Sequence, residues 1–259
     1  MSSAPLPVPM HRRLVAEFLG TAVLVAVVVG SGIAAEQLSP NDVGLQLLEN
    51  STATVFGLTI LILLFGPVSG AHFNPVVSAA DWLLGRKAGT GLTGGDVGAY
   101  AIAQTLGAIV GAVLANVMFD IDIAELSGKD RTGSNLLVAE VVATAGLVAL
   151  IFALARTGRG ALAAPAVGAY IGAAYWFTSS TSFANPAVTV GRMFSDTFAG
   201  IDPSSVPGFI AAQVVGGLLG LALVRYLFPD IASVADDVVV PHATTHPSPP
   251  ETADTRSTR

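Results

Sequence analysis

Cysteine is absent from this 259-residue chain, which excludes disulfides, thiolate metal sites and cysteine nucleophiles. Histidine is scarce, and the four residues are too scattered to indicate a metal site: His11, His72, His242 and His246. No phosphate-binding loop and no nucleophile–base pair is recognisable. We therefore expect no enzymatic activity, catalytic residue, cofactor or nucleic-acid partner.

Charge is also scarce, because charged residues make up 12% of the chain and hydrophobic residues 52%. A typical soluble domain carries about 25% charged residues. The charges gather between six apolar segments, several of them near the roughly 20 residues that cross a bilayer as a helix. These segments are 14–35, 51–65, 97–119, 136–154, 162–177 and 206–228. The composition predicts an all-α membrane protein, and 14–35 is too long for a signal-peptide core, so we expect it to be a retained span.

Two short motifs follow the second and the fifth span. They are Asn74-Pro75-Val76 and Asn185-Pro186-Ala187. Asn is a strong helix N-cap and Pro is favoured at the first helical position, so each motif predicts a helix start. Because each start lies between long apolar segments, we expect two re-entrant half-helices.

The polar residues around the motifs have the same order in each half of the chain. Glu17 precedes the first motif and Gln104 follows it, while Glu140 precedes the second and Gln213 follows it. This order indicates an internal repeat. The repeats cover 12–119 and 135–228. Three spans per repeat is an odd number, so the second repeat is predicted to be inverted in the membrane.

Basic residues in the short loops predict the orientation, because cytoplasmic loops are enriched in Lys and Arg. One side of the predicted membrane has Arg12, Arg13, Arg86, Lys87, Arg156, Arg159 and Arg225. The other side has only Lys129, Arg131 and Arg192, among many acidic residues. Both termini are therefore expected in the cytoplasm, as a short leading segment (1–11) and a disordered tail (229–259).

Three stretches occur in a characteristic order and spacing. They are Ala16-Glu17-Phe18-Leu19-Gly20-Thr21, Ser69-Gly70-Ala71-His72-Phe73-Asn74-Pro75-Val76 and Asn185-Pro186-Ala187. Together they resemble the aquaporin or major intrinsic protein family, over 12–228. The resemblance implies a right-handed bundle of six spanning helices and two half-helices. It also implies a homotetramer in the cell membrane, with one pore per subunit that passively conducts small neutral solutes.

Two opposed half-helices favour the same function on physical grounds. Helix N-termini carry partial positive charge, so two that meet at mid-membrane repel cations, protons included. The Asn74 and Asn185 amides are predicted to offer N–H donors to a passing oxygen. The predicted carbonyl acceptors are those of Gly70, Ala71, His72 and Phe73, and those of 182–184.

Carboxylates within spans are functional candidates by default, so Glu17 and Glu140 have two interpretations. They relay protons, or, as the resemblance implies, each accepts backbone N–H bonds from a re-entrant loop. We favour the second, with Gln104 and Gln213 in a similar role. His72 is expected to brace its loop rather than to act as a titrating gate. Three aromatic residues are expected to pack or to lie at the membrane interface: Trp82, Tyr175 and Trp176.

The chain departs from the family just after the second motif, because most members carry a filter-forming arginine where this chain has Val188. Spacing from the motifs places the other filter positions at Thr54, Ala173 and Ser182, or at Gly172 instead of Ala173 if the alignment shifts by one. This ring has a weaker charge barrier and is predicted to be wider than a water filter. It would pass glycerol, urea or arsenous acid. A subgroup of bacterial aquaglyceroporins associated with arsenic resistance is similar, including the valine.

Arg192 lies seven residues after Asn185 and therefore on the same helix face. It either replaces part of the missing charge or is a vestibule or surface arginine. Three other functions also stay open: a strict water channel, an ion-coupled secondary transporter and a non-conducting membrane scaffold. The transporter is disfavoured, because neither Asn-Pro motif has a clear carboxylate for a coupling ion.

Overall fold

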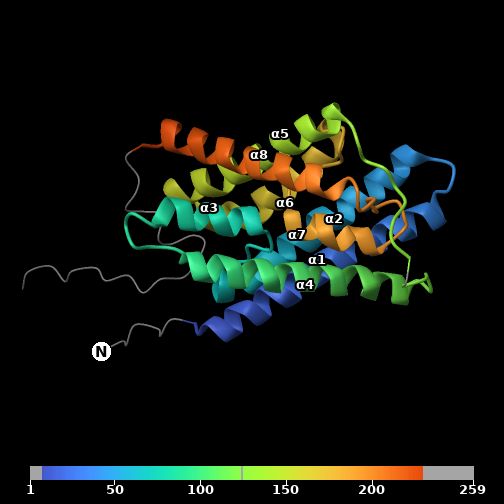
Figure 1. The fold of residues 1–259 in the computed structure, drawn as a ribbon, viewed down its shortest axis with the longest axis horizontal. Coiled ribbons are helices and arrows are strands. Elements are labelled where there is room, and N and C mark those ends of the chain that lie inside the picture. Colours follow the sequence, from blue (N-terminus) through green and yellow to red (C-terminus); the bar gives the residue numbers. More distant parts are fainter. Residues whose placement is uncertain (1–7, 124, 230–259) are drawn as a thin grey trace, which may run out of the picture.

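The computed structural model describes residues 8–123 and 125–229, which form a helical bundle without strands (Figure 1). Within these residues, six helical segments are long and apolar enough to cross a membrane. Five are single helices: α1 (Met10–Leu38), α2 (Val43–Ser69), α4 (Gly94–Met118), α5 (Ser134–Arg156) and α8 (Val206–Leu227). The sixth is Gly160–Phe177, in which the 3-10 turn η1 (Gly160–Leu162) leads into α6 (Ala163–Phe177). The predicted all-α membrane fold is confirmed, while the expected tail from residue 230 onward lies outside the described residues.

α2 differs most from its predicted range, since 51–65 was expected and the helix is Val43–Ser69. Gln46 and Asn50 interrupt the apolar run in its first half, but both side chains are buried. Asn50 Nδ2 donates to the Val28 carbonyl of α1 at 2.8 Å. A polar group that is satisfied by a neighbouring helix can stay inside the bundle, so hydropathy alone underestimates this span.

The two half-helices are α3 (Pro75–Gly85) and α7 (Pro186–Gly191), the latter continued by the turn η2 (Arg192–Phe194). Asn74 caps α3 by accepting the Val76 N–H at 3.0 Å, and Asn185 caps α7 by accepting the Ala187 N–H at 3.0 Å. In Figure 1 the two half-helices lie roughly end to end in the middle of the bundle. Both therefore start inside it and run toward opposite ends.

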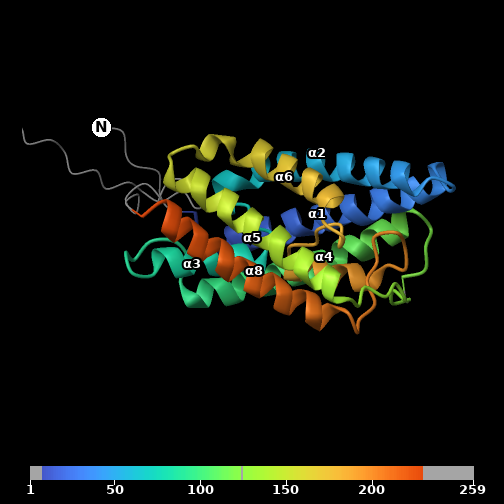
Figure 2. The ribbon, with the colours of Figure 1, turned by 90° about the horizontal axis from the view of Figure 1, so that it is seen from above.

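Glycines at matching positions allow close helix packing in each repeat. A Cβ on Gly107 of α4 would lie 2.3 Å from the Phe18 carbonyl oxygen of α1. A Cβ on Gly216 of α8 would lie 2.5 Å from the Val141 carbonyl oxygen of α5. Small residues let helix backbones approach this closely in lipid. The pairs α1–α4 and α5–α8 are thus equivalent units of the two repeats (Figure 2).

The start of α1 and the end of α8 lie at the same end of the bundle (Figure 1). The end of α8 also contacts α3, because Arg225 Nη2 donates to the Leu83 carbonyl at 2.8 Å. An even number of spans returns the chain to its starting side. We call this the terminal end of the bundle and the other the distal end.

Candidate pore and outer filter

A cavity of about 280 Å³ runs along the inner face of α2. Thr54, Leu58, Ile62 and Gly66 line it at every fourth position, so it follows the helix for about 18 Å. Other helices add lining residues at similar spacing: Leu24 and Val28 on α1, Leu147 and Ile151 on α5, and Val167, Ile171 and Tyr175 on α6. The cavity is elongated and mostly apolar.

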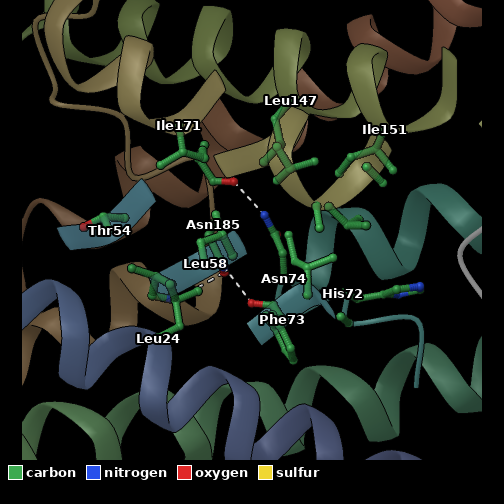
Figure 3. A pocket seen from close by; sticks show the side chains of 18 of the residues that line it. Leu24, Thr54, Leu58, His72, Phe73, Asn74, Leu147, Ile151, Ile171 and Asn185 are labelled. Carbon is green, nitrogen blue, oxygen red and sulfur yellow. Dashed lines mark hydrogen bonds between the residues drawn. The ribbon is translucent and has the colours of Figure 1, made fainter. Parts of the chain in front are cut away.

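Asn74 and Asn185 lie side by side in this cavity (Figure 3). Asn74 Nδ2 donates to the Ala184 carbonyl at 2.7 Å, and Asn185 Nδ2 donates to the Phe73 carbonyl at 2.7 Å. Each amide oxygen caps its own half-helix. Because an amide nitrogen carries two hydrogens, one N–H of each asparagine remains for a solute.

Both re-entrant loops adopt a backbone conformation that is unusual without glycine. The φ angles are 50° at Ala71, 49° at Phe73, 51° at Ser182 and 49° at Ala184. Such residues cost on the order of 1–3 kcal/mol each and persist only where their surroundings hold them. The residues of both loops, 70–73 and 182–184, line the cavity.

Glu17 holds the first loop from behind. Its carboxylate accepts the N–H groups of His72 and Phe73 at 3.0 and 2.7 Å, the Ser69 hydroxyl at 2.6 Å and Gln104 Nε2 at 2.7 Å. Glu17 is fully buried and does not line the cavity. Its acceptor sites are occupied by the loop and its neighbours, which favours bracing over proton relay.

Glu140 holds the second loop through the same set of contacts. It accepts the N–H groups of Phe183 and Ala184 at 2.8 Å each, the Ser180 hydroxyl at 2.6 Å and Gln213 Nε2 at 2.7 Å. The two repeats therefore match in their hydrogen bonds as well as in sequence order.

The remaining residues of the two motifs differ in whether they line the cavity and in what they contact. The side chain of His72 points away from the asparagines (Figure 3), and its Nδ1 lies 3.0 Å from Ser78 Oγ. Its ring packs edge-on against Tyr100 at 5.4 Å. Four motif residues begin the half-helices without lining the cavity: Pro75, Val76, Pro186 and Ala187.

Toward the distal end the cavity is bordered by Thr54, Tyr175, Ser182 and Val188, all of them buried. Tyr175 Oη lies 3.2 Å from Thr54 Oγ1. Ser182 Oγ is enclosed and has no hydrogen-bond partner in the described residues. This level combines three hydroxyl groups with one apolar wall at Val188.

The structure does not place Ala173 at this level. Ala173 is exposed on the outer face of α6, and Gly172 packs toward Val55, so neither lines the cavity. Ile171 and Tyr175 line it instead, which makes the expectation for Ala173 wrong. Tyr175, expected as a packing or interface aromatic, is a lining residue. The helical period from Val167 through Ile171 to Tyr175 is the sequence signal that would have found it.

Arg192 also lines the cavity, and only 2% of its surface is exposed. It therefore does not lie on the protein surface, which was one of its two expected places. In the described residues no cluster of three or more His, Asp or Glu side chains could hold a metal ion.

The comparison with known proteins decides the family. Residues 6–182 match the family model described as major intrinsic protein. The chain belongs to the major intrinsic protein family. An aquaglyceroporin, AqpS, of Rhizobium meliloti (strain 1021) is 51% identical over 218 residues, which cover 84% of this chain and 91% of that protein. The aquaporin AqpM of Methanothermobacter marburgensis is 29% identical and covers 85% of this chain and 98% of its own length.

The fold of this major intrinsic protein is similar to that of a solved structure as well. The X-ray structure of the aquaglyceroporin from Plasmodium falciparum matches with a TM-score of 0.59 and 20% identity, over 87% of this chain and 98% of that one. At this identity the match supports the aquaporin-like fold alone.

Proposed function

We propose that this major intrinsic protein is a passive membrane channel for water and for small neutral polyols of the glycerol type. The observation that carries the proposal is the pair of asparagines in the cavity, each with one N–H free beside a row of backbone carbonyls. Such a site exchanges hydrogen bonds with a hydroxyl group in both directions, because the amides donate and the carbonyls accept. The 51% identical relative, which is named an aquaglyceroporin, supports the same function.

We further propose that arsenous acid and similar neutral metalloid hydroxides pass this pore. Val188 presents an apolar wall where most family members have a charged one, and Thr54 and Ser182 are small. Tyr175 adds a larger ring at this level, so the opening is narrower than a ring of small residues alone. The Tyr175 hydroxyl is itself a hydrogen-bond partner for the solute.

The surroundings of the pore complete the proposal. The terminal end of the bundle faces the cytoplasm, because basic loops stay on that side of the cell membrane. The basic residues there include Arg12 in the first turn of α1, Arg86 after α3 and Arg225 in the last turn of α8. The chain assembles as a homotetramer, as the family resemblance implies. Protease digestion of terminal tags in sealed vesicles tests the orientation, and native mass spectrometry tests the assembly.

Stopped-flow light scattering of proteoliposomes tests the function. Water, glycerol and arsenite are compared in the same vesicles, with empty vesicles as the control. Solute fluxes above the control that rise linearly with concentration support the channel. Flux of water alone would identify a strict water channel. Saturable flux driven by an ion gradient would identify a transporter. The absence of any flux from correctly folded protein would identify a scaffold.

A further inference from the structure

Val188 leaves the distal level of the pore without a charged group. Its side chain lines the cavity, and its backbone N–H is donated to Asn185 Oδ1 at 3.2 Å. No donor at this position is left for a solute.

Arg192 lies four residues beyond Val188, at the first position of the turn η2 that continues the half-helix. Four residues return to the same face of a helix and advance it by about 6 Å. A helical side chain leans toward the N-terminus of its helix, which here is the centre of the pore. Both residues border the same cavity, so the side chain of Arg192 can reach toward the level where Val188 stands.

The guanidinium of Arg192 is held in place from two sides. Its Nε donates to the Ala199 carbonyl, and its Cζ lies 3.5 Å from the centroid of the Phe183 ring. Phe183 is itself buried and packs edge-on against Phe209 at 5.1 Å. Stacking on an aromatic face orients a guanidinium without using its outer N–H groups.

Those outer groups are available to a ligand. Within residues 8–123 and 125–229, neither Nη atom of Arg192 forms a hydrogen bond or an ion pair, and neither is fully enclosed. Glu140, the carboxylate that holds the second loop, already accepts four hydrogen bonds from its own loop and its neighbours. A second guanidinium, that of Arg131, lies 4.9 Å from the Phe183 ring, but its Nε donates to the Gly200 carbonyl.

We propose that Arg192 is a specificity-determining residue of the pore, which supplies the positive charge and the N–H donors that Val188 lacks, about one helical turn further out. The filter then has two levels. The inner level has hydroxyl groups and the apolar wall, and it sets the size of the solute. The outer level has the cation, which binds the oxygens of neutral solutes and repels cations.

This proposal rests on the proposed channel function, and its test uses single-cysteine variants because the chain has no cysteine of its own. Proteoliposomes carry Arg192→Cys, and sodium and glycerol permeabilities are measured in the same preparation. Loss of the charge is expected to raise the sodium-to-glycerol permeability ratio about tenfold or more, since a unit charge is removed close to the ion path. A cationic trimethylammonium-ethyl thiosulfonate, added from outside, is expected to lower the ratio again, and an anionic sulfonatoethyl thiosulfonate is not.

The matched control is Ala173→Cys, on the exposed face of α6, where neither reagent should change the ratio. An unchanged ratio in folded Arg192→Cys, or the same response to both reagents, overturns the proposal. If wild-type vesicles show no glycerol flux at all, the channel function fails instead, so the two failures are distinguishable.

A second variant keeps Arg192 in place and covers the case in which Arg192→Cys does not fold. The thiol of Val188→Cys is expected to react about tenfold faster with the anionic than with the cationic reagent, relative to their rates with a free thiol in solution. Equal relative rates would mean that no positive potential reaches this level, and the proposal would be wrong.

Discussion

Asn74 and Asn185 complete each other's loops. Each donates one amide N–H to the carbonyl of the residue just before the other, at 2.7 Å in both directions. The bonds cross between the two repeats at the point where the half-helices meet. These two bonds fix which amide hydrogen of each asparagine bonds the opposite loop and which remains for the solute. Both repeats are therefore needed to form the centre of the pore.

Replacing Asn74 by Asp keeps the size of the side chain and removes its donor. The carboxylate then faces the Ala184 carbonyl, which loses its partner, and a negative charge enters the region of the two helix N-termini. We expect a stability loss of about 1–3 kcal/mol and an increased sodium leak relative to glycerol flux. Asn185→Asp should behave alike, because its contacts are equivalent. A variant that matches wild type in thermal unfolding and sodium leak would contradict the assigned role.

Val188→Arg is expected to slow glycerol more than water. The larger, charged side chain narrows the inner level and lies close to Arg192, adding a barrier of roughly 1.4 kcal/mol for the bulkier solute, which is about tenfold in rate. Stopped-flow measurements of both solutes give the ratio. Val188→Ile is the control, because it enlarges the same side chain slightly and adds no charge. An unchanged glycerol-to-water ratio would show that Val188 does not border the path.

Tyr175→Phe tests the corrected filter position. The variant keeps the ring and removes the hydroxyl that lies 3.2 Å from Thr54 Oγ1. We expect glycerol permeability to fall about twofold to twelvefold, the effect of one lost hydrogen bond of about 0.5–1.5 kcal/mol. Tyr226→Phe is the matched control, because Tyr226 is 82% exposed. Equal glycerol permeability in the two variants would remove Tyr175 from the filter.

Glu140→Gln tests the brace behind the second loop. The neutral amide accepts with one oxygen only, so at least one of the N–H groups of Phe183 and Ala184 loses its partner. The expected cost is about 1–3 kcal/mol, together with reduced flux of every solute. Glu125→Gln, at an exposed loop position, should stay within about 0.5 kcal/mol of wild type. Thermal unfolding in detergent gives both values, and normal stability with altered proton flux alone would revive the relay interpretation.

Gly107→Ala tests helix packing within the first repeat. Its new Cβ would meet the Phe18 carbonyl oxygen at 2.3 Å, a backbone atom that cannot move away easily. We expect a destabilisation of about 1–3 kcal/mol, typical of overpacking. Gly98→Ala on the same helix has no neighbour within 4 Å and should be neutral or slightly stabilising. Similar melting temperatures for the two variants would argue against the close α1–α4 contact.

The sequence predicts the fold here because its strongest signals are local. Long apolar runs define the spans, and the Asn-Pro pairs define the starts of the half-helices. The caps confirm these starts, because Asn74 accepts the Val76 N–H and Asn185 accepts the Ala187 N–H. Ala173 was misplaced because its position was counted back from Asn185 through a loop. That loop contains left-handed residues at Thr181, Ser182 and Ala184, and its path has no constant rise per residue. The helix α6 does have a constant rise per residue, and counting along it in steps of four residues from Val167 leads to Tyr175.

The place of Arg192 could not be decided from the sequence for a different reason. Its face of the half-helix was predictable, but its burial depends on Phe183 and on the Ala199 carbonyl, which belongs to the loop after η2. Contacts between a side chain and a distant loop carry no sequence period. Only the folded chain shows that the arginine turns inward.

The crossed asparagine bonds also set an order of events during synthesis. Asn74 and Ala184 are 110 positions apart, so the first re-entrant loop waits for its partner while the rest of the first repeat and about half of the second are made. At about 5–20 residues per second, this interval lasts roughly 5–20 s. We expect the first half-helix to have its cap and its Glu17 brace during this interval, because their partners are already made, while the Asn74 amide still lacks the Ala184 carbonyl. The newly inserted first repeat is therefore expected to hold water or translocon contacts at that point, until the second repeat closes the channel.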